Sequence, residues 1–200
     1  MIVSDDLETG SGNINITGTG STASANARGI LTGGTNIQSA SGQITLIDNT
    51  DGNSANYTGT YISGTTKFGK GSLASSSSNI IISADKIGFD GSANDYTTSG
   101  IVTIEPFGTS FTAALTLPSP GLSLATTVSG LTLGKATNTQ NITFGGATTI
   151  TGPITAYGGN ITVDGNMKMP YFKGYFNSND PNLRMDFDGL VDLSSRVKNY

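Results

Sequence analysis

Short segments in which apolar residues alternate with polar ones recur along the chain. In most copies a Thr, Asn or Ser stands between two apolar residues, and a Gly or Asn stands just before them. The copies lie at 12–18, 42–47, 79–82, 100–104, 121–124, 130–134, 141–145 and 159–163. Such alternation places the apolar side chains on one face of a strand and the polar ones on the other. The pattern therefore predicts many short β-strands joined by tight turns.

The spacing of these strands predicts their arrangement. Strand starts at positions 80, 101, 122, 142 and 161 are separated by 21, 21, 20 and 19 residues. One such rung cannot bury its apolar stripe alone, but stacked rungs align Ile on Ile in a continuous core. We therefore predict an all-β fold, a right-handed parallel β-helix (β-solenoid) with rungs of about 20 residues and two or three strands in each rung. A β-sandwich is the alternative, although its strands are longer and less regular.

The pattern divides the chain into four parts. They are an N-terminal lead-in (1–9), looser rungs (10–78), regular rungs (79–166) and a non-repetitive tail or start of another domain (167–200). The looser part owes its longer intervals to polar excursions at 19–28 and 48–59. The tail holds nine of the 24 charged residues, three of the four Met and six of the 15 Phe and Tyr. This shift in composition predicts a boundary after Asn166.

Composition narrows the classes of function. The chain has no Cys, His or Trp, while Ser, Thr and Gly fill 80 of its 200 positions. Only 12 % of residues are charged, against about a quarter in an average globular domain. A net charge of -4 also disfavours nucleic acid, which attracts a basic surface. We therefore expect no enzyme, no cofactor and no nucleic-acid partner.

The apolar runs are three or four residues long, far below the roughly 20 residues that a transmembrane helix needs. Residues 1–6 are neither basic nor long enough for a signal peptide. If the protein is secreted, its export signal is expected outside this sequence.

Acidic residues are the remaining candidates for chemistry, because paired carboxylates can cleave glycosidic bonds. Four of them precede a Gly in turn dipeptides, and none has a second acid in register one rung away. Asp48 and Asp51 lie in an oxygen-rich stretch that suggests calcium. Gly59, however, stands where an EF-hand loop would have its bidentate Glu, so this stretch is interpreted first as a loop and second as a metal site.

Aromatic rings could mark a sugar-binding surface, since they stack on sugar rings. Tyr57, Tyr61 and Tyr96 lie in loop-like segments and are the candidate ligand-binding residues. The remaining rings of the repeats are expected to fill the interior or to cap its ends; they are Phe89, Phe107, Phe111 and Phe144.

Four Asn-x-Thr sequons are candidate glycosylation sites, at Asn15, Asn56, Asn141 and Asn160. Three of them fall where the Asn of a turn meets the Ile-Thr of a strand. The repeat pattern alone therefore generates them, and a purely structural origin is the alternative.

The repeats at 11–20, 27–31, 41–46, 128–135 and 150–163 resemble those of filamentous-haemagglutinin-type exoproteins of Gram-negative bacteria. The resemblance covers about residues 10–166. It implies a right-handed parallel β-helix within a very large secreted or cell-surface chain. It also implies export through an outer-membrane secretion partner, and adhesion to host or surface glycans or proteins.

The segment 170–193 is similar instead to strand repeats of AsmA/TamB-type envelope proteins, whose β-groove is associated with lipid transport. Three functions therefore stay open. The first is a structural and adhesive stalk, in which neighbouring rungs of the same chain are the main contacts. The second is a lipid-transport groove with an open, apolar channel. The third is a carbohydrate-active β-helix with two carboxylates converging on one face.

Overall fold

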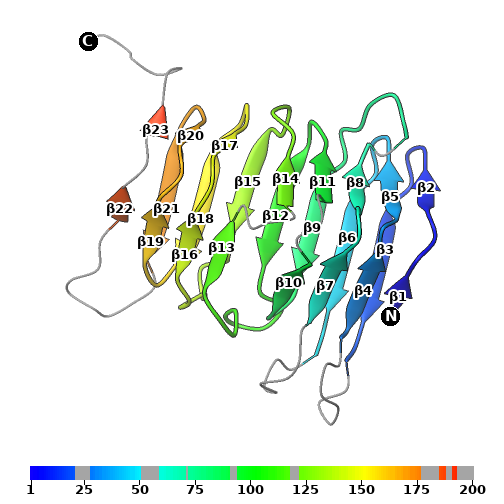
Figure 1. Ribbon diagram of the computed structural model, residues 1–200, viewed down its shortest axis with the longest axis horizontal. Coiled ribbons are helices and arrows are strands. Elements are labelled where there is room, and N and C mark those ends of the chain that lie inside the picture. The colour runs from blue at the N-terminus through cyan, green and yellow to red at the C-terminus, as the bar shows by residue number, and fades with distance from the viewer. Residues whose placement is uncertain are drawn as a thin grey trace.

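The computed structural model describes residues 1–20, 28–50, 59–70, 72–90, 94–117 and 122–176, and the backbone of two further short strands near the C-terminus. In this part of the chain all regular structure is β, and every pairing between strands is parallel. No helix here is long and apolar enough to cross a membrane. The predicted fold class, a parallel β-solenoid, is confirmed (Figure 1).

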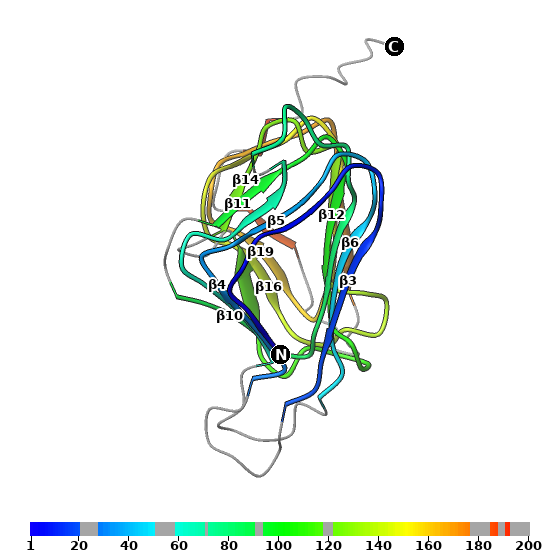
Figure 2. The same cartoon turned by 90° about the vertical axis from the view of Figure 1, so that its right-hand side faces the viewer.

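Each turn of the solenoid contains three strands, so that every third strand along the chain lies on the same face (Figure 2). The long face is one continuous sheet of β3 (Ile14–Gly18), β6 (Ile44–Asp48), β9 (Ile80–Ser83), β12 (Ile101–Glu105), β15 (Gly130–Leu133), β18 (Ile154–Gly158) and β21 (Phe172–Phe176).

The other two faces each consist of two sheets. The second face has β1 (Ile2–Val3), β4 (Ile30–Gly33), β7 (Thr60–Ser63) and β10 (Ile87–Phe89), then β13 (Leu115–Leu117), β16 (Ile142–Phe144), β19 (Ile161–Val163) and β22 (Met185–Phe187). The third face has β2 (Leu7–Thr9), β5 (Asn36–Ser39), β8 (Lys67–Gly69), β11 (Asn94–Thr97) and β14 (Leu122–Leu124), then β17 (Thr148–Thr149), β20 (Met167–Lys168) and β23 (Val191–Asp192).

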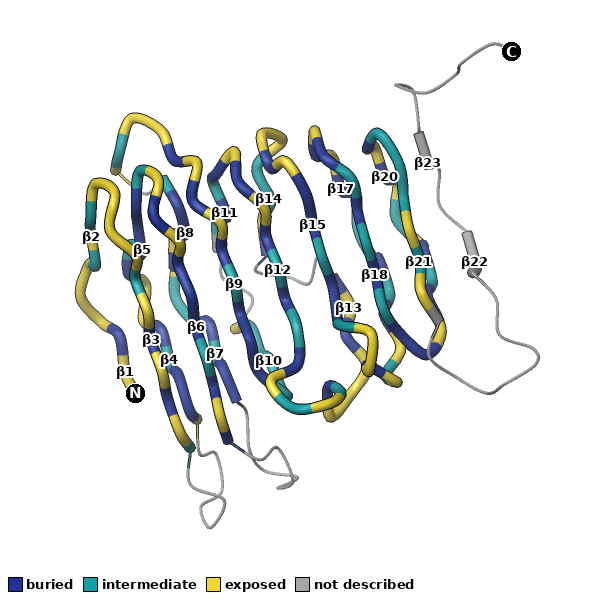
Figure 3. Tube along the Cα trace, turned by 180° about the vertical axis from the view of Figure 1, so that it is seen from behind, coloured by how far each residue is buried: buried dark blue, intermediate teal, exposed yellow. Residues whose placement is uncertain are grey.

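The core is a set of apolar columns that run along the solenoid. Buried residues recur along the strands (Figure 3), and in-register pairing places them above one another. One inward column of the long face is formed by Ile16, Leu46, Ile82, Ile104, Leu133 and Ala156, all of them buried. Burial of these side chains is the main stabilising term, at about 25 cal/mol for each Å² of apolar surface.

The turns are less regular than the sequence suggests. Successive paired positions on the long face are Ile14, Ile44, Ile80, Val102, Leu131, Ile154 and Phe172. The interval thus ranges from 18 residues, between 154 and 172, to 36 residues, between 44 and 80. The even spacing of the predicted strand starts does not measure the length of a turn, because 122 lies on the third face and 142 and 161 lie on the second. All three faces carry the same apolar-polar motif, so the spacing compared strands that belong to different faces.

The change of composition after Asn166 does not end the solenoid. β20 pairs with β17, and β21 pairs with β18 over five positions, beginning at Ile154 and Phe172. β22 and β23 then extend the second and third faces. The predicted boundary was therefore wrong for these strands. Aromatic and charged residues replace Ile and Thr there, but the strands pair with the preceding turn as the earlier strands do.

The two predicted excursions share one corner of the solenoid, between the long face and the second face. Residues 21–27 and 51–58 lie outside the described part of the chain. At their ends the backbone of Asn49 donates to the carbonyl of Gly18 over 3.1 Å, and that of Gly29 donates to Gly59 over 2.9 Å. The turns are thus bonded to each other on both sides of these segments.

A ladder of hydroxyl groups joins the turns at the corner between the third face and the long face. Here the side chain of Ser78 donates to the Ser39 carbonyl over 2.9 Å, and Thr98 donates to the Ser78 carbonyl over 2.7 Å. Thr127 then donates to the Thr98 carbonyl over 2.8 Å. The abundance of Ser and Thr therefore has a structural use, because each hydroxyl ties one turn to the turn before it.

Asparagines that precede strands serve a similar purpose. The side-chain oxygens of Asn13, Asn79 and Asn141 accept backbone N–H groups of the following turn over 2.8, 2.9 and 2.9 Å. The buried Asn138 goes further, since its amide donates to the carbonyls of Tyr157 and Gln140 and its oxygen accepts N–H groups in return. These contacts satisfy backbone groups that the strands leave unpaired at the corners.

Glycine is required where successive turns approach most closely. A Cβ at Gly42 would overlap the carbonyl oxygen of Gly12, and a Cβ at Gly152 would overlap that of Ser129. Both positions follow the hydroxyl ladder at the same corner. Any side chain there would push two turns apart.

We expect Gly152→Ala to destabilise the protein by about 1–3 kcal/mol, the range for overpacking of a close contact. The matched control is Gly10→Ala, because nothing lies within 4 Å of a Cβ at Gly10. Urea unfolding followed by circular dichroism measures both. Equal midpoints for the two variants would contradict the close approach at this corner.

Candidate functional site

The structure separates the three candidate tyrosines. Tyr57 lies outside the described residues. Tyr61, on β7, is half-buried, and the Arg28 guanidinium lies over its ring at 4.2 Å from the centroid. One face of that ring is therefore occupied by a cation from the chain itself.

Tyr96 is a core residue, which corrects its assignment as a ligand-binding ring. It points inward from β11, is completely buried and stacks on Phe68 with the centroids 4.8 Å apart. Its hydroxyl has no hydrogen-bond partner among the described residues. Burial raises the pKa of the Tyr96 phenol above its ordinary value of 10.0, because the ionised form would lose its hydration.

The phenylalanines expected in the interior behave differently from one another. Phe111 and Phe144 are buried, and Phe89 packs against the core while half-buried. Phe107 is 44 % exposed and follows a strand in the middle of the long face, so the expectation that it fills the interior or caps an end was wrong. It follows β12 in the stretch that leaves the long face, where alternation no longer fixes the direction of a side chain.

Asp48 has a structural role in the described part of the chain, while Asp51 lies outside that part. Asp48 is buried, and its carboxylate accepts the backbone N–H and the hydroxyl of Thr50 over 3.1 and 2.8 Å. It also packs closely on Gly29 of the adjacent turn. Among the described residues no group of three acidic, His or Cys side chains is arranged to hold a metal ion.

Three of the four sequon asparagines are exposed, namely Asn15, Asn141 and Asn160, and Asn56 lies outside the described residues. Asn141 and Asn160 stand above one another at the same corner, where the Asn141 side-chain oxygen accepts the Asn160 N–H. This contact gives the sequon at Asn141 a structural explanation. Glycosylation of these positions stays a prediction.

An aromatic pair that was not predicted from the sequence lies on the outer surface of the long face. Tyr157 and Tyr175 are paired in register on β18 and β21, and their rings stack with centroids 4.7 Å apart. Tyr175 is 46 % exposed. Each Tyr stands the same number of residues after the first residue of its strand, and this equal position could have predicted the pair.

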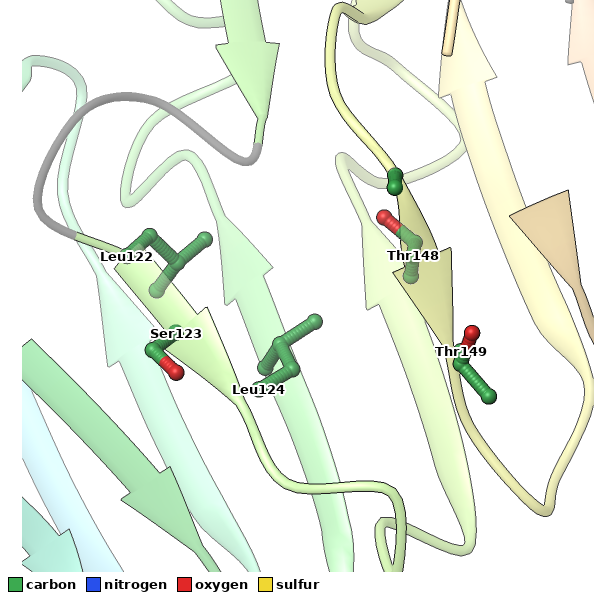
Figure 4. A pocket seen from close by; sticks show the side chains of 6 residues that line it. Leu122, Ser123, Leu124, Thr148 and Thr149 are labelled. Atoms are coloured by element: carbon green, nitrogen blue, oxygen red, sulfur yellow. The ribbon is translucent and has the colours of Figure 1, made fainter. Parts of the chain in front are cut away.

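The clearest concave feature arises from an interruption of the third face. β14 and β17 belong to successive turns, yet in the described structure β14 pairs with β11 and β17 with β20, and no ladder joins them. On the other faces of the same turns β15 pairs with β18, and β13 with β16. One edge of β14 therefore faces one edge of β17 across an open gap (Figure 4).

A cavity of about 190 Å³ fills this gap, and we call it the gap cleft. Its lining is Leu122, Ser123, Leu124, Ala147, Thr148 and Thr149. Ser123 and Thr149 are exposed at its mouth, whereas Leu122 and Thr148 are buried beneath. No lining residue is charged, so the cleft offers hydroxyls, methyl groups and two strand edges.

A second cavity of about 260 Å³ adjoins the gap cleft and shares Thr149 with it. Its floor includes the apolar side chains of Ile150, Met169 and Pro170, and Lys168 stands among them. The two cavities together form a trough that follows β17 toward the corner with the long face.

Comparison of the chain with protein-family models, with curated proteins and with solved structures gave no match.

Replacing Tyr96 with Phe tests the buried phenol. We expect no loss of stability at pH 7 and a gain of up to about 1 kcal/mol, because an unpaired buried hydroxyl is removed without loss of the ring. Above pH 10 the wild-type protein should lose stability relative to Tyr96→Phe by about 1.4 kcal/mol per pH unit, since the phenol ionises in the unfolded chain and not in the folded one.

Urea unfolding of both proteins between pH 7 and pH 11 measures this difference. A loss of more than 1 kcal/mol in the variant at pH 7 would mean that the hydroxyl has a partner.

Proposed function

We propose that this chain is a structural and adhesive β-solenoid segment of a large secreted bacterial surface protein. It acts as a stalk, and its outer faces and loops contact surface glycans or proteins. The observation that carries the proposal is the long face, a sheet of parallel strands that runs without a break from β3 to β21 over one packed core.

Such a sheet supports a role as a shaft because it resists extension along its axis. Adjacent strands are about 4.8 Å apart, and each ladder along the axis is a row of backbone hydrogen bonds that load together. The outer edges of β3 and β21 have no strand partner among the described residues. Further turns of the same kind can therefore stack on either edge.

The distribution of apolar residues favours a shaft over a lipid-transport groove. A groove needs an open channel lined by apolar side chains, whereas here the inward columns are packed and buried. Among the described residues, the exposed large apolar side chains are scattered in position and form no continuous path for an acyl chain; they are Met1, Ile2, Ile101, Phe107 and Tyr175.

The acidic residues likewise give little support to a carbohydrate-active enzyme. The buried Asp48 carboxylate accepts the backbone N–H and the hydroxyl of Thr50, which fixes a turn. Asp6 is engaged by Asn36, whose hydrogen bonds lower the pKa of the Asp6 carboxyl. Such a group stays ionised, which suits it for anchoring a turn and not for donating a proton.

A vesicle assay tests the shaft against the groove. The full chain, mixed with vesicles of fluorescent phosphatidylcholine, is expected to carry no lipid to acceptor vesicles above the protein-free rate. A bovine serum albumin sample of equal mass provides the positive comparison. Saturable lipid transfer that scales with protein concentration would contradict the proposal.

A flow-chamber assay tests adhesion. Beads coated with the full chain are expected to remain on glycoprotein-coated glass under shear at least several-fold more often than beads coated with the same chain after heat denaturation. Beads coated with Gly10→Ala should match the wild type, because that variant is expected to keep the fold. Equal retention of folded and denatured coatings would remove the adhesive part of the proposal.

A further inference from the structure

We infer that the gap cleft binds an extended, uncharged peptide by strand addition, so that the peptide pairs with the free edges of β14 and β17. This inference is independent of the proposed stalk function, since it rests on the interruption of the third face. The peptide would belong to a partner protein.

The interruption is confined to one side of these turns. The ladders from β15 to β18 and from β13 to β16 hold the same two turns together on the long and second faces. The third face therefore opens as a wedge between two fixed walls. Because both walls are held in place, a ligand can enter without a rearrangement of the strands.

The break on the second face, between β10 and β13, differs from this gap. There the chain that leads into β13 is bonded to the preceding turn, because Gly108 donates to the Asp85 carboxylate over 2.6 Å and Thr112 donates to the Asp85 carbonyl over 2.8 Å. At the gap cleft the two turns are bonded beyond the strands, at the corner with the long face, where Thr151 and Gly152 donate to the Val128 carbonyl over 3.1 and 3.2 Å. No ladder in the described structure joins β14 to β17 themselves.

The backbone of both walls points into the cleft. Thr148 and Ile150 donate their N–H groups to Asn166 and Lys168, on the β20 side. Successive backbone groups of a strand point to opposite edges, so the N–H and C=O of Thr149 face β14.

The opposite wall follows the same rule. Ala125 donates to the Tyr96 carbonyl on the β11 side, so the backbone groups of Leu124 and Leu122 face β17. Each wall thus presents N–H donors and C=O acceptors at the spacing of alternate strand residues. An extended peptide carries N–H and C=O groups along both of its edges, so it matches both walls.

The chemistry of the trough defines the peptide further. The gap cleft has hydroxyls at Ser123 and Thr149 and no charge, which suits small or β-branched uncharged side chains. The adjoining cavity has an apolar floor at Ile150, Met169 and Pro170. A parallel peptide would therefore place an apolar side chain at its C-terminal end there.

The probe is the capped hexapeptide acetyl-Thr-Val-Thr-Val-Thr-Leu-amide, added to the full chain. Hydrogen exchange followed by NMR is expected to show at least tenfold slower exchange of the Thr149 and Leu124 amides at saturation. The Ile150 amide, which already donates to Lys168, should not change. Protection of Thr149 and Leu124 before any peptide is added would overturn the inference, because the cleft would then be filled by the chain itself.

The matched peptide control carries N-methyl groups on both Val residues and on Leu, which removes its donors along one edge without changing its side chains. Fluorescence anisotropy of labelled peptides is expected to show at least tenfold weaker binding of the methylated form. Equal binding of the two forms would overturn strand addition. So would protection of the cleft amides by a neutral sugar such as galactose in place of the peptide.

Variants of the protein complete the test. Thr149→Pro removes the N–H that faces the cleft and leaves the ladder to β20, since that ladder uses Thr148 and Ile150. It is expected to weaken peptide binding at least tenfold, whereas Thr149→Val, which keeps the backbone donor, should stay within twofold of wild type. Unchanged binding by a folded Thr149→Pro protein would contradict the inference, and the N-methyl control decides the case if this variant does not fold.

Discussion

The close stacking of turns at the corner between the third and long faces is the contact on which the structure depends. There, hydroxyls such as that of Thr98 donate to carbonyls of the preceding turn, and glycines such as Gly152 leave room for the approach. This contact sets the register of the strands that follow. Register in turn decides whether Ile104 lies above Ile82 or is displaced by one residue, which would turn every inward side chain outward.

Alternation along the chain was sufficient to predict the fold class, because a period of two fixes strands and a recurring stripe fixes stacking. It was insufficient to assign strands to faces. The segments at Leu122, Ile142 and Ile80 look alike in sequence, yet they lie on three different faces. The corner between them decides the face, and the corners differ in length and composition. The predicted boundary before the tail failed for the opposite reason, because a different residue occupies the same place. Phe172 replaces Ile in the inward column above Ile154.

The candidate site could be predicted only in part. Tyr96 lies between polar neighbours and looks like a surface ring, but its pairing with Phe68 and Leu124 places it in the core. The gap cleft has no local signal at all. It exists because the strands at 122–124 and 148–149 fail to meet while their neighbours on the other faces do, and such a mismatch depends on the path of two whole turns.

The same interruption limits the affinity with which the gap cleft can bind a peptide. Its free backbone groups are open to water, which satisfies them and explains why the fold tolerates them without a strand partner. A peptide that enters must replace those hydrogen bonds to water, so each new bond contributes only about 0.5–1.5 kcal/mol. Only three residues, Leu122, Leu124 and Thr149, direct their backbone groups into the cleft, so one cleft supports weak binding. Strong attachment through such a site requires a second contact between the same two partners, because the first contact then holds the other one in place.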